Sequence, residues 1–345
     1  MVKMYLVIKL RSFFVLSGVF TLNILFYGCN DNGSTNLAVH YSPTPYSYDV
    51  PTHFPQMILP VSNSPTFEGV ALGRKLYYDS ILHPWNLKSC SSCHFQEFGF
   101  STPGVNVLPH VNLAYNSKFL WNGRISNSLE DAMRFEVREF FGTDVSKLQN
   151  SAVYPSLFFK AFGSSYINHE RIEMALAQFL RSIVSGNSKF DRFLRHEENL
   201  SLSEMMGFTI FNSEKGDCFH CHSLPLMTDG QLHNIGLDSV FVGSDLGFFL
   251  SSGNPADKGK FKTPSLRNVL TRSSFMHDGR FSTIDEVINH YNNDVKLSNS
   301  LDPIMTKPGK EFGLGLTPFE IHNLKAFLNT LTDTTIFTNP LFGKP

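Results

Sequence analysis

The spacing of apolar side chains along the chain is helical wherever it is regular. Between residues 172 and 184 apolar positions recur every three or four residues, as on one face of an α-helix. They are Ile172, Leu176, Phe179, Leu180, Ile183 and Val184. No stretch shows the sustained alternation of apolar and polar residues that a strand would give. The pattern therefore predicts an all-α fold with long irregular loops.

Two further helices are predicted from their first residues. Thr317, Pro318 and Glu320 supply an N-cap, a proline at the first helical position and the acidic partner of a capping box. Apolar residues follow on one face: Ile321, Leu324, Phe327, Leu328 and Leu331. A second capping box, Thr283 to Glu286, begins a helix whose apolar face is Ile284, Val287, Ile288 and Tyr291. Spacing alone favours a core role for Tyr291, with its hydroxyl bonded to a backbone carbonyl.

Residues 1–28 have the order of an export signal. Lys3, Lys9 and Arg11 precede an apolar run that ends at Gly28-Cys29. This order resembles a bacterial lipoprotein signal, in which Cys29 would be lipidated and become the mature N-terminus. The alternative is an uncleaved membrane anchor, for which the run is short. Either interpretation places the rest of the chain outside the cytoplasm, and we expect a lipid-anchored protein of the periplasm with a flexible tether over residues 29–54.

The remaining chain, from residue 55 on, is long enough for two domains with separate cores. Its charges are balanced, with 29 Lys and Arg against 30 Asp and Glu. This balance gives no argument for a nucleic-acid partner.

The strongest chemical signal is the motif Cys-x-x-Cys-His, which occurs twice and uses four of the five cysteines. Two thiols at this spacing can each form a thioether with a haem vinyl group, while the adjacent histidine binds the iron. The motifs are Cys90, Cys93 and His94, then Cys218, Cys221 and His222. Redox or zinc sites are the alternatives, but zinc would need further Cys or His pairs at finger spacing. The sequence thus predicts two covalent haem c groups.

These motifs divide the chain into two predicted cytochrome c-like domains, residues 55–195 and 196–345. A haem iron bound by one histidine has a second axial position, and its occupant decides between catalysis and electron transfer. Around the second haem the candidates are Met276, His277 and Tyr291.

Several stretches around both motifs resemble bacterial di-haem cytochrome c peroxidases and MauG-type enzymes. They are LGRKLYYD at 72–79, WNGR at 121–124, SLE at 128–130, FKTPSLRN at 261–268 and FMHDGR at 275–280. The resemblance implies that the first haem is the peroxide site and that the second handles electrons. It also implies that Trp121 lies between them, against the alternative of an ordinary core aromatic.

The resemblance also changes the expectation for Tyr291. In this family the residue fourteen positions after the histidine of the Phe-Met-His motif is the sixth ligand of the second haem, Met in the peroxidases and Tyr in MauG-type enzymes. Counting from His277 gives Tyr291, which we therefore expect as ligand. A phenolate is hard and anionic, so it stabilises iron(III), whereas a thioether favours iron(II).

The resemblance implies a glutamate acid–base group after the Trp-x-Gly-Arg motif, but the sequence departs from the family pattern there. Glu139 is the first choice and Glu136 the second, and either could instead be a solvated charge. Ala132 stands near the place of a glutamine often found beside this acid. His110 is a candidate distal ligand of the first haem, although its register relative to Trp121 argues against that role.

Calcium is a further cofactor implied by the resemblance. Asn106 matches the family's calcium-ligating asparagine. The two carbonyl-donating positions are Arg272 and Ser274 here, and Arg272 adds an unfavourable positive charge.

The resulting prediction is a di-haem peroxidase that reduces hydrogen peroxide to water. Its electrons would come from a small donor protein of the cytochrome c or cupredoxin type, and a homodimer is left open beside a monomer. One alternative is a MauG-type oxidase that modifies a protein partner, which Tyr291 favours. The other is a non-enzymatic electron carrier in which both irons are six-coordinate.

Overall fold

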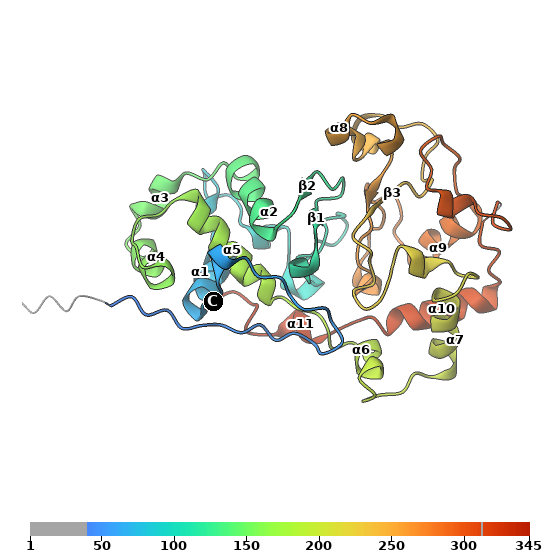
Figure 1. Cartoon of the computed structure of the whole chain (residues 1–345), viewed down its shortest axis with the longest axis horizontal. Coiled ribbons are helices and arrows are strands. Elements are labelled where there is room, and N and C mark those ends of the chain that lie inside the picture. Colours follow the sequence, from blue (N-terminus) through green and yellow to red (C-terminus); the bar gives the residue numbers. More distant parts are fainter. Residues whose placement is uncertain (1–39, 312) are drawn as a thin grey trace, which may run out of the picture. The chain divides into compact units, whose positions relative to one another are not determined.

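The computed structural model describes residues 40–311 and 313–345, which form a mostly helical fold (Figure 1). The predicted helices are present as α5 (His169–Ser182), α9 (Ile284–Asn293) and α10 (Pro318–Asn329). Both predicted capping boxes form, at the starts of α9 and α10. The mostly helical character predicted from the pattern is therefore confirmed.

The other helices are α1 (Phe67–Tyr78), α2 (Leu129–Phe135), α3 (Val145–Gln149), α4 (Tyr154–Phe162), α6 (Lys189–Leu194), α7 (Leu202–Phe211), α8 (Phe249–Ser252) and α11 (Thr335–Thr338). Four short strands among the described residues were not predicted. β1 (Lys118–Phe119) pairs with β2 (Ile125–Ser126), and β3 (Leu232–His233) pairs with β4 (Phe261–Lys262), both antiparallel. A two-residue strand is too short for an alternating pattern to be recognised, so the all-α prediction missed them.

Each half of the chain contains two helices that pack closely against each other at a glycine. In α1, a Cβ added to Gly73 would lie 1.9 Å from the Ala175 carbonyl oxygen of α5. In α7, a Cβ added to Gly207 would lie 1.9 Å from the Asn323 carbonyl oxygen of α10. Each pair therefore needs glycine for its close contact. The first helix of each pair is the last α-helix before a Cys-x-x-Cys-His motif in the chain, so one arrangement is used twice.

Buried apolar side chains form two clusters along the same division. One draws on residues between 72 and 183 and the other on residues between 190 and 331. Phe327 of α10 is central to the second, because its ring lies 5.1 Å from the rings of both Phe190 and Phe211, centroid to centroid. Each half of the chain therefore has its own core.

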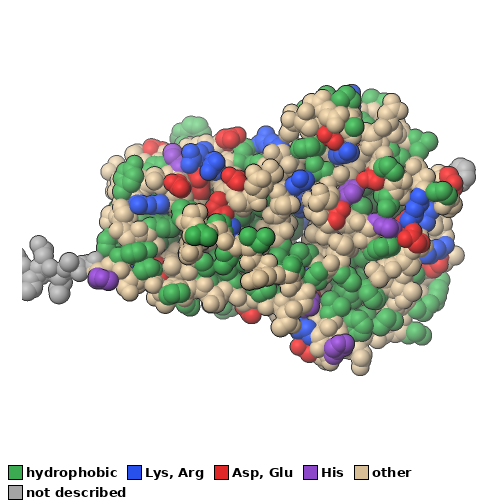
Figure 2. All heavy atoms as spheres, in the orientation of Figure 1, with side chains coloured by type: hydrophobic (Ala, Val, Ile, Leu, Met, Phe, Trp, Pro, Cys, Tyr) green, Lys and Arg blue, Asp and Glu red, His purple; other side chains and the backbone are tan. Residues whose placement is uncertain are grey.

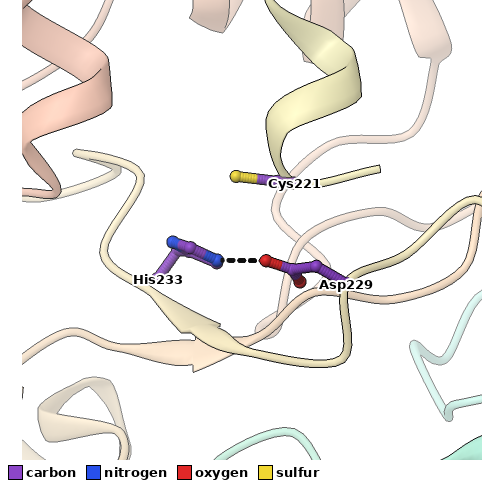
Figure 3. A group of neighbouring side chains, drawn as sticks. All are labelled: Cys221, Asp229 and His233. Atoms are coloured by element: carbon purple, nitrogen blue, oxygen red, sulfur yellow. Dashed lines mark hydrogen bonds and ion pairs between the residues drawn. The ribbon is translucent and has the colours of Figure 1, made fainter. Parts of the chain in front are cut away.

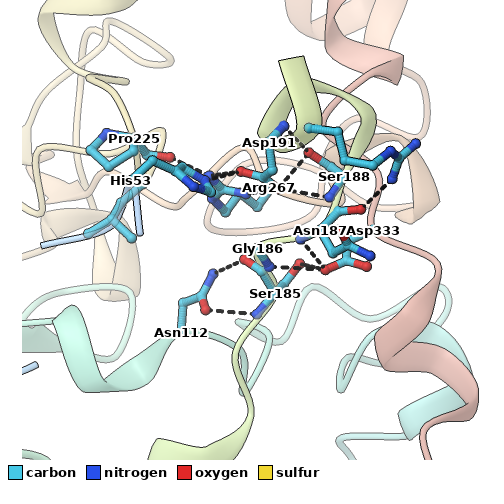
Figure 4. A network of polar contacts seen from close by, with 12 residues as sticks. His53, Asn112, Ser185, Gly186, Asn187, Ser188, Asp191, Pro225, Arg267 and Asp333 are labelled. Carbon is cyan, nitrogen blue, oxygen red and sulfur yellow. Dashed lines mark hydrogen bonds and ion pairs between the residues drawn. The ribbon is translucent and has the colours of Figure 1, made fainter. Parts of the chain in front are cut away.

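A buried polar network ties α6 to Arg267, which follows β4, and to His53 (Figure 4). Asp191 of α6 accepts two hydrogen bonds from the Arg267 guanidinium, both at 2.8 Å, and one contact from His53 Nε2 at 2.7 Å. Burial alone would raise the pKa of Asp191, but Arg267, Ser188 and His53 together lower it to about 2. Asp191 is therefore a buried carboxylate with its charge compensated.

The segment assigned to the tether makes specific contacts over its described part. The Tyr41 hydroxyl donates to the Ala161 carbonyl at 3.2 Å, and the Tyr48 hydroxyl donates to the Gln178 carbonyl at 3.0 Å. The predicted signal peptide and Cys29 lie outside the described residues. Within the described ranges, no helix is both long and apolar enough to cross a membrane. On the face drawn in Figure 2, acidic and basic side chains are interspersed, as expected for a net charge of -1.

Candidate haem sites

The first motif folds so that His94 presents one ring nitrogen. Cys90 begins a 3-10 turn, and the His94 N–H donates to the Cys90 carbonyl at 3.1 Å. His94 Nδ1 contacts the Phe100 carbonyl at 3.0 Å, so Nδ1 carries the proton and Nε2 is the nitrogen available to a metal. Burial lowers the pKa of His94 to about 4, which keeps the imidazole in its neutral, ligating form.

The second motif repeats this geometry. Cys218 begins a 3-10 turn, the His222 N–H donates to the Cys218 carbonyl at 2.8 Å, and His222 Nδ1 contacts the Met227 carbonyl at 3.1 Å. Burial lowers the pKa of His222 to about 4 as well. In both motifs a backbone carbonyl therefore fixes the tautomer and orients the histidine as a metal ligand.

A cavity of about 220 Å³ lies beside the second motif. Cys218, Cys221 and His222 line it together with Tyr291, Trp121 and many apolar side chains. Thiols, a preoriented imidazole and an apolar wall are what a covalent haem requires. The residues present thus fit a haem c group attached through Cys218 and Cys221.

Tyr291 reaches this cavity from the last turns of α9. Its hydroxyl makes no hydrogen bond with any described residue, so the carbonyl partner expected for an ordinary core tyrosine is missing. Burial, and after it the thiols of Cys221 and Cys218, raise the pKa of Tyr291 above its usual range. A cavity-facing hydroxyl without a partner is suited to an iron ligand, because a metal would supply the missing interaction.

The two competing ligand candidates also line the cavity. His277 is engaged at one nitrogen: its Nε2 lies 3.0 Å from an Asp245 carboxylate oxygen, and its ring stacks on Phe261 with centroids 3.6 Å apart, while its Nδ1 is buried without a partner among the described residues. Met276 has a backbone φ of 67°, which is uncommon for a residue with a side chain. Of the three candidates, Tyr291 alone combines a place on a regular helix with an unpartnered polar atom.

Trp121 lies in the turn between β1 and β2, yet it lines the cavity of the second motif. Its indole Nε1 donates to the Asn106 carbonyl at 2.9 Å, and its own carbonyl accepts from the Lys262 N–H at 2.8 Å. The residue therefore belongs to the first half by sequence and contacts the second half at β4.

The two glutamates near the first motif differ in environment. A π-helical turn, Glu136–Phe140, continues α2 and carries both. Glu139 is exposed, whereas Glu136 is partly buried and close enough to Cys90 for its charge to help raise the pKa of that thiol, after burial. Burial raises the pKa of Glu136 itself to about 7, against the lowering effects of Arg124 and Lys88. Glu136 is thus the glutamate that faces the first motif with a perturbed carboxyl.

His110 lies beside the proximal histidine of the first motif. Its ring stacks on the His94 ring, with centroids 3.3 Å apart and an angle of 12° between the planes. The Tyr77 hydroxyl lies 3.3 Å from His110 Nδ1. A distal ligand has to approach the iron from the side opposite His94, so this position does not suit His110 for that role.

The surroundings of Asn106 do not fit a calcium ion. Its side-chain oxygen, the atom that would bind calcium, accepts a hydrogen bond from the Arg272 guanidinium, which also donates to the Val107 carbonyl at 2.9 Å. Calcium requires several oxygen ligands, usually including carboxylates, and is repelled by a cation in contact with one of them. The positive charge of Arg272, which the sequence analysis counted against calcium, therefore directly contacts the oxygen that calcium would need.

Two aspartates, Asp229 and Asp302, contact His233, and neither contact was predicted; Figure 3 shows the contact with Asp229. His233 contacts Asp229 at 2.8 Å through Nε2 and Asp302 at 2.5 Å through Nδ1, and these two bonds raise the pKa of His233 to about 12. Cys221, Asp229 and His233 are close enough together to hold a metal ion. Both His233 nitrogens are occupied, however, so the group is an ion-pair cluster beside the haem attachment site. No local motif in the sequence marks it.

Comparisons with known proteins lead to one group of proteins. The family model of di-haem cytochrome c peroxidases matches residues 67–199. The methylamine utilization protein MauG of Methylophilus methylotrophus is 33% identical over 291 residues, which cover 79% of this chain and 84% of that protein. Cytochrome-c peroxidase IdrP2 of Denitromonas iodatirespirans is 28% identical, with coverage of 79% and 84%. A crystal structure of a MauG-like protein associated with microbial copper homeostasis superposes with a TM-score of 0.80 at 27% identity, covering 87% of this chain and 99% of that one.

Proposed function

Because this chain belongs to the family of di-haem cytochrome c peroxidases and MauG proteins, whose members are oxidoreductases with two haem c groups, we propose that it is a MauG-type oxidase. It would use hydrogen peroxide to withdraw electrons from, and covalently modify, a protein partner. The two haems would be held by cytochrome c-like domains at residues 55–195 and 196–345.

The observation that carries this proposal is the Tyr291 hydroxyl, which faces the cavity of His222 and has no partner among the described residues. As a phenolate it would be a hard, anionic ligand that favours iron(III) over iron(II). By this preference Tyr291 would favour a haem that stores an oxidising equivalent over one that delivers an electron. The MauG name of the relative that is 33% identical supports the same choice.

Glu136 would manage the proton at the first haem. When bound, the haem supplies the iron that binds peroxide and accepts or gives electrons. The Glu136 carboxylate would take a proton from peroxide and return it to the departing oxygen as the O–O bond breaks, so that water leaves. Its exposed neighbour Glu139, the first choice from sequence, lacks the apolar surroundings for this task.

Trp121 would connect the two centres. It lines the cavity of the second motif and belongs to the β1–β2 turn of the first half. A large aromatic ring between two cofactors can hold an electron vacancy for a short time, so Trp121 would act as an intermediate stop. We place the protein in the periplasm, attached by lipid at Cys29, as the sequence of the export signal indicates.

The proposal is tested with fully oxidised holoprotein. If Tyr291 closes the second iron, this protein should consume one equivalent of peroxide without prior reduction, and a protein encoded beside its gene should gain a covalent change detectable by mass spectrometry. The Tyr291→Met variant should need prior reduction before it reacts. Peroxide consumption that depends on prior reduction in the wild type would contradict the proposal.

A cytochrome c peroxidase is the second candidate, favoured by the peroxidase names of relatives such as the one 28% identical. It would pass electrons from a small redox protein to peroxide without changing that protein. Steady turnover of peroxide with a reduced cytochrome or cupredoxin, and no covalent product on the donor, would identify this activity. A simple electron carrier would show neither peroxide consumption nor a high-spin iron.

A further inference from the structure

Arg272 is a partly buried cation without an acidic partner among the described residues, at the junction of the two halves. It follows the 3-10 turn Val269–Thr271, and its guanidinium reaches back to residues 106 and 107. No carboxylate among the described residues forms an ion pair with it. Burial lowers the pKa of Arg272 to about 10, so the guanidinium still carries its charge at neutral pH.

The contacts of Arg272 lead directly to Trp121. The Asn106 side-chain oxygen accepts from the guanidinium, and the Asn106 main-chain carbonyl accepts from the Trp121 indole N–H at 2.9 Å. Arg272, Asn106 and Trp121 all line the cavity of the second motif.

We propose that this protein binds no calcium between its halves, and that the Arg272 guanidinium is the built-in cation that holds Asn106 and, through it, the Trp121 indole. An arginine can replace a bound ion here because its planar group donates to two oxygens at once, as it does to Asn106 and Val107. Unlike a bound ion, it cannot be removed by a chelator. Arg272 is thus a positioning residue for Trp121, and the junction is independent of metal supply.

The first test measures calcium itself. Holoprotein with both haems is purified without chelator, its calcium content is determined by elemental analysis, and its unfolding temperature is recorded with added calcium and with EDTA. We expect far less than one calcium per chain and the same unfolding temperature in both buffers. About one calcium per chain, or an unfolding temperature that falls in EDTA, would overturn the proposal.

The second test measures the hydrogen bond that the Trp121 indole N–H donates to the Asn106 carbonyl. The chain has two tryptophans, so Trp85→Phe leaves Trp121 as the only indole. In that background, Arg272→Met should shift the Raman band that reports hydrogen bonding of the indole N–H. Arg280→Met is the matched control, because Arg280 lies in the same segment but pairs with Asp238 and Asp278. An unshifted band in Arg272→Met would contradict the positioning role.

These measurements do not depend on the proposed activity, since neither calcium content nor the indole band requires turnover. If Arg272→Met does not fold, the calcium content and chelator response of the unaltered protein still decide whether a metal occupies the junction.

Discussion

The Trp121 indole donates its N–H to the main-chain carbonyl of Asn106 at 2.9 Å. This bond fixes the ring in the wall of the cavity that His222 and Tyr291 also line. The arrangement joins a residue of the first half to the cavity of the second motif, so changes at Trp121 should affect communication between the two haems more than either haem alone.

Replacing Trp121 with phenylalanine should therefore leave both haems attached and both resting spectra nearly unchanged. Transfer of an oxidising equivalent between the two haems should become slower, because the larger and more easily oxidised indole is lost. Rapid-mixing spectroscopy after addition of peroxide checks this. Trp85→Phe is the matched control, since Trp85 is 76% exposed and should give wild-type rates. Equal rates in both variants would exclude the bridging role.

Replacing Glu136 with glutamine should slow the reaction with peroxide by about 10²- to 10⁴-fold, the usual contribution of a positioned acid–base group. Glu139→Gln should react at nearly the wild-type rate, because Glu139 is exposed. Stopped-flow measurement of the reaction of ferric protein with peroxide compares the two. A larger loss of rate in Glu139→Gln than in Glu136→Gln would instead make Glu139 the acid–base group, as the sequence analysis preferred.

The pH dependence of the same reaction follows from the Glu136 carboxyl. Burial raises its pKa to about 7, so the group is protonated below this pH and becomes a carboxylate above it. The carboxylate is the form that accepts a proton from peroxide, so the rate should rise as pH increases through about 7. This rise of the rate with pH should be absent in Glu136→Gln. Its persistence in that variant would assign the titration to another group.

The buried pair of Asp191 and Arg267 should matter for stability. Asp191→Asn removes one charge and leaves the Arg267 guanidinium buried, which costs about 3–5 kcal/mol in other proteins. Asp285→Asn breaks the exposed pair with Lys325 and should cost at most about 1 kcal/mol. Denaturant unfolding of the two holoproteins measures both changes. Similar losses would mean that the buried pair of Asp191 and Arg267 contributes no more to stability than an exposed pair.

Short sequence patterns were enough to predict those features that are formed by residues close together in the chain. The two haem motifs and the capping boxes at Thr283 and Thr317 are of this kind. Tyr291 was reached by counting along one helix from a recognised motif, and it lines the expected cavity. Residues whose environment depends on tertiary contacts were harder to predict.

Glu136 and Glu139 illustrate the difference. Both lie in one short turn, and only the packing of that turn decides which is buried. The Arg272 contact joins residues 166 positions apart, and His233 depends on Asp302, which is 69 positions away. The two-residue strands β3 and β4 likewise pair only because the fold brings distant segments together.

The central claim is that Tyr291 closes the second iron while the first stays open. Electron spin resonance of the ferric holoprotein tests it most directly, in the wild type and in Tyr291→Phe. We predict one high-spin signal from the open iron and a second signal from the closed iron in the wild type, with the second signal alone converted to a high-spin form in Tyr291→Phe. A spectrum that is the same in the two proteins would contradict the claim.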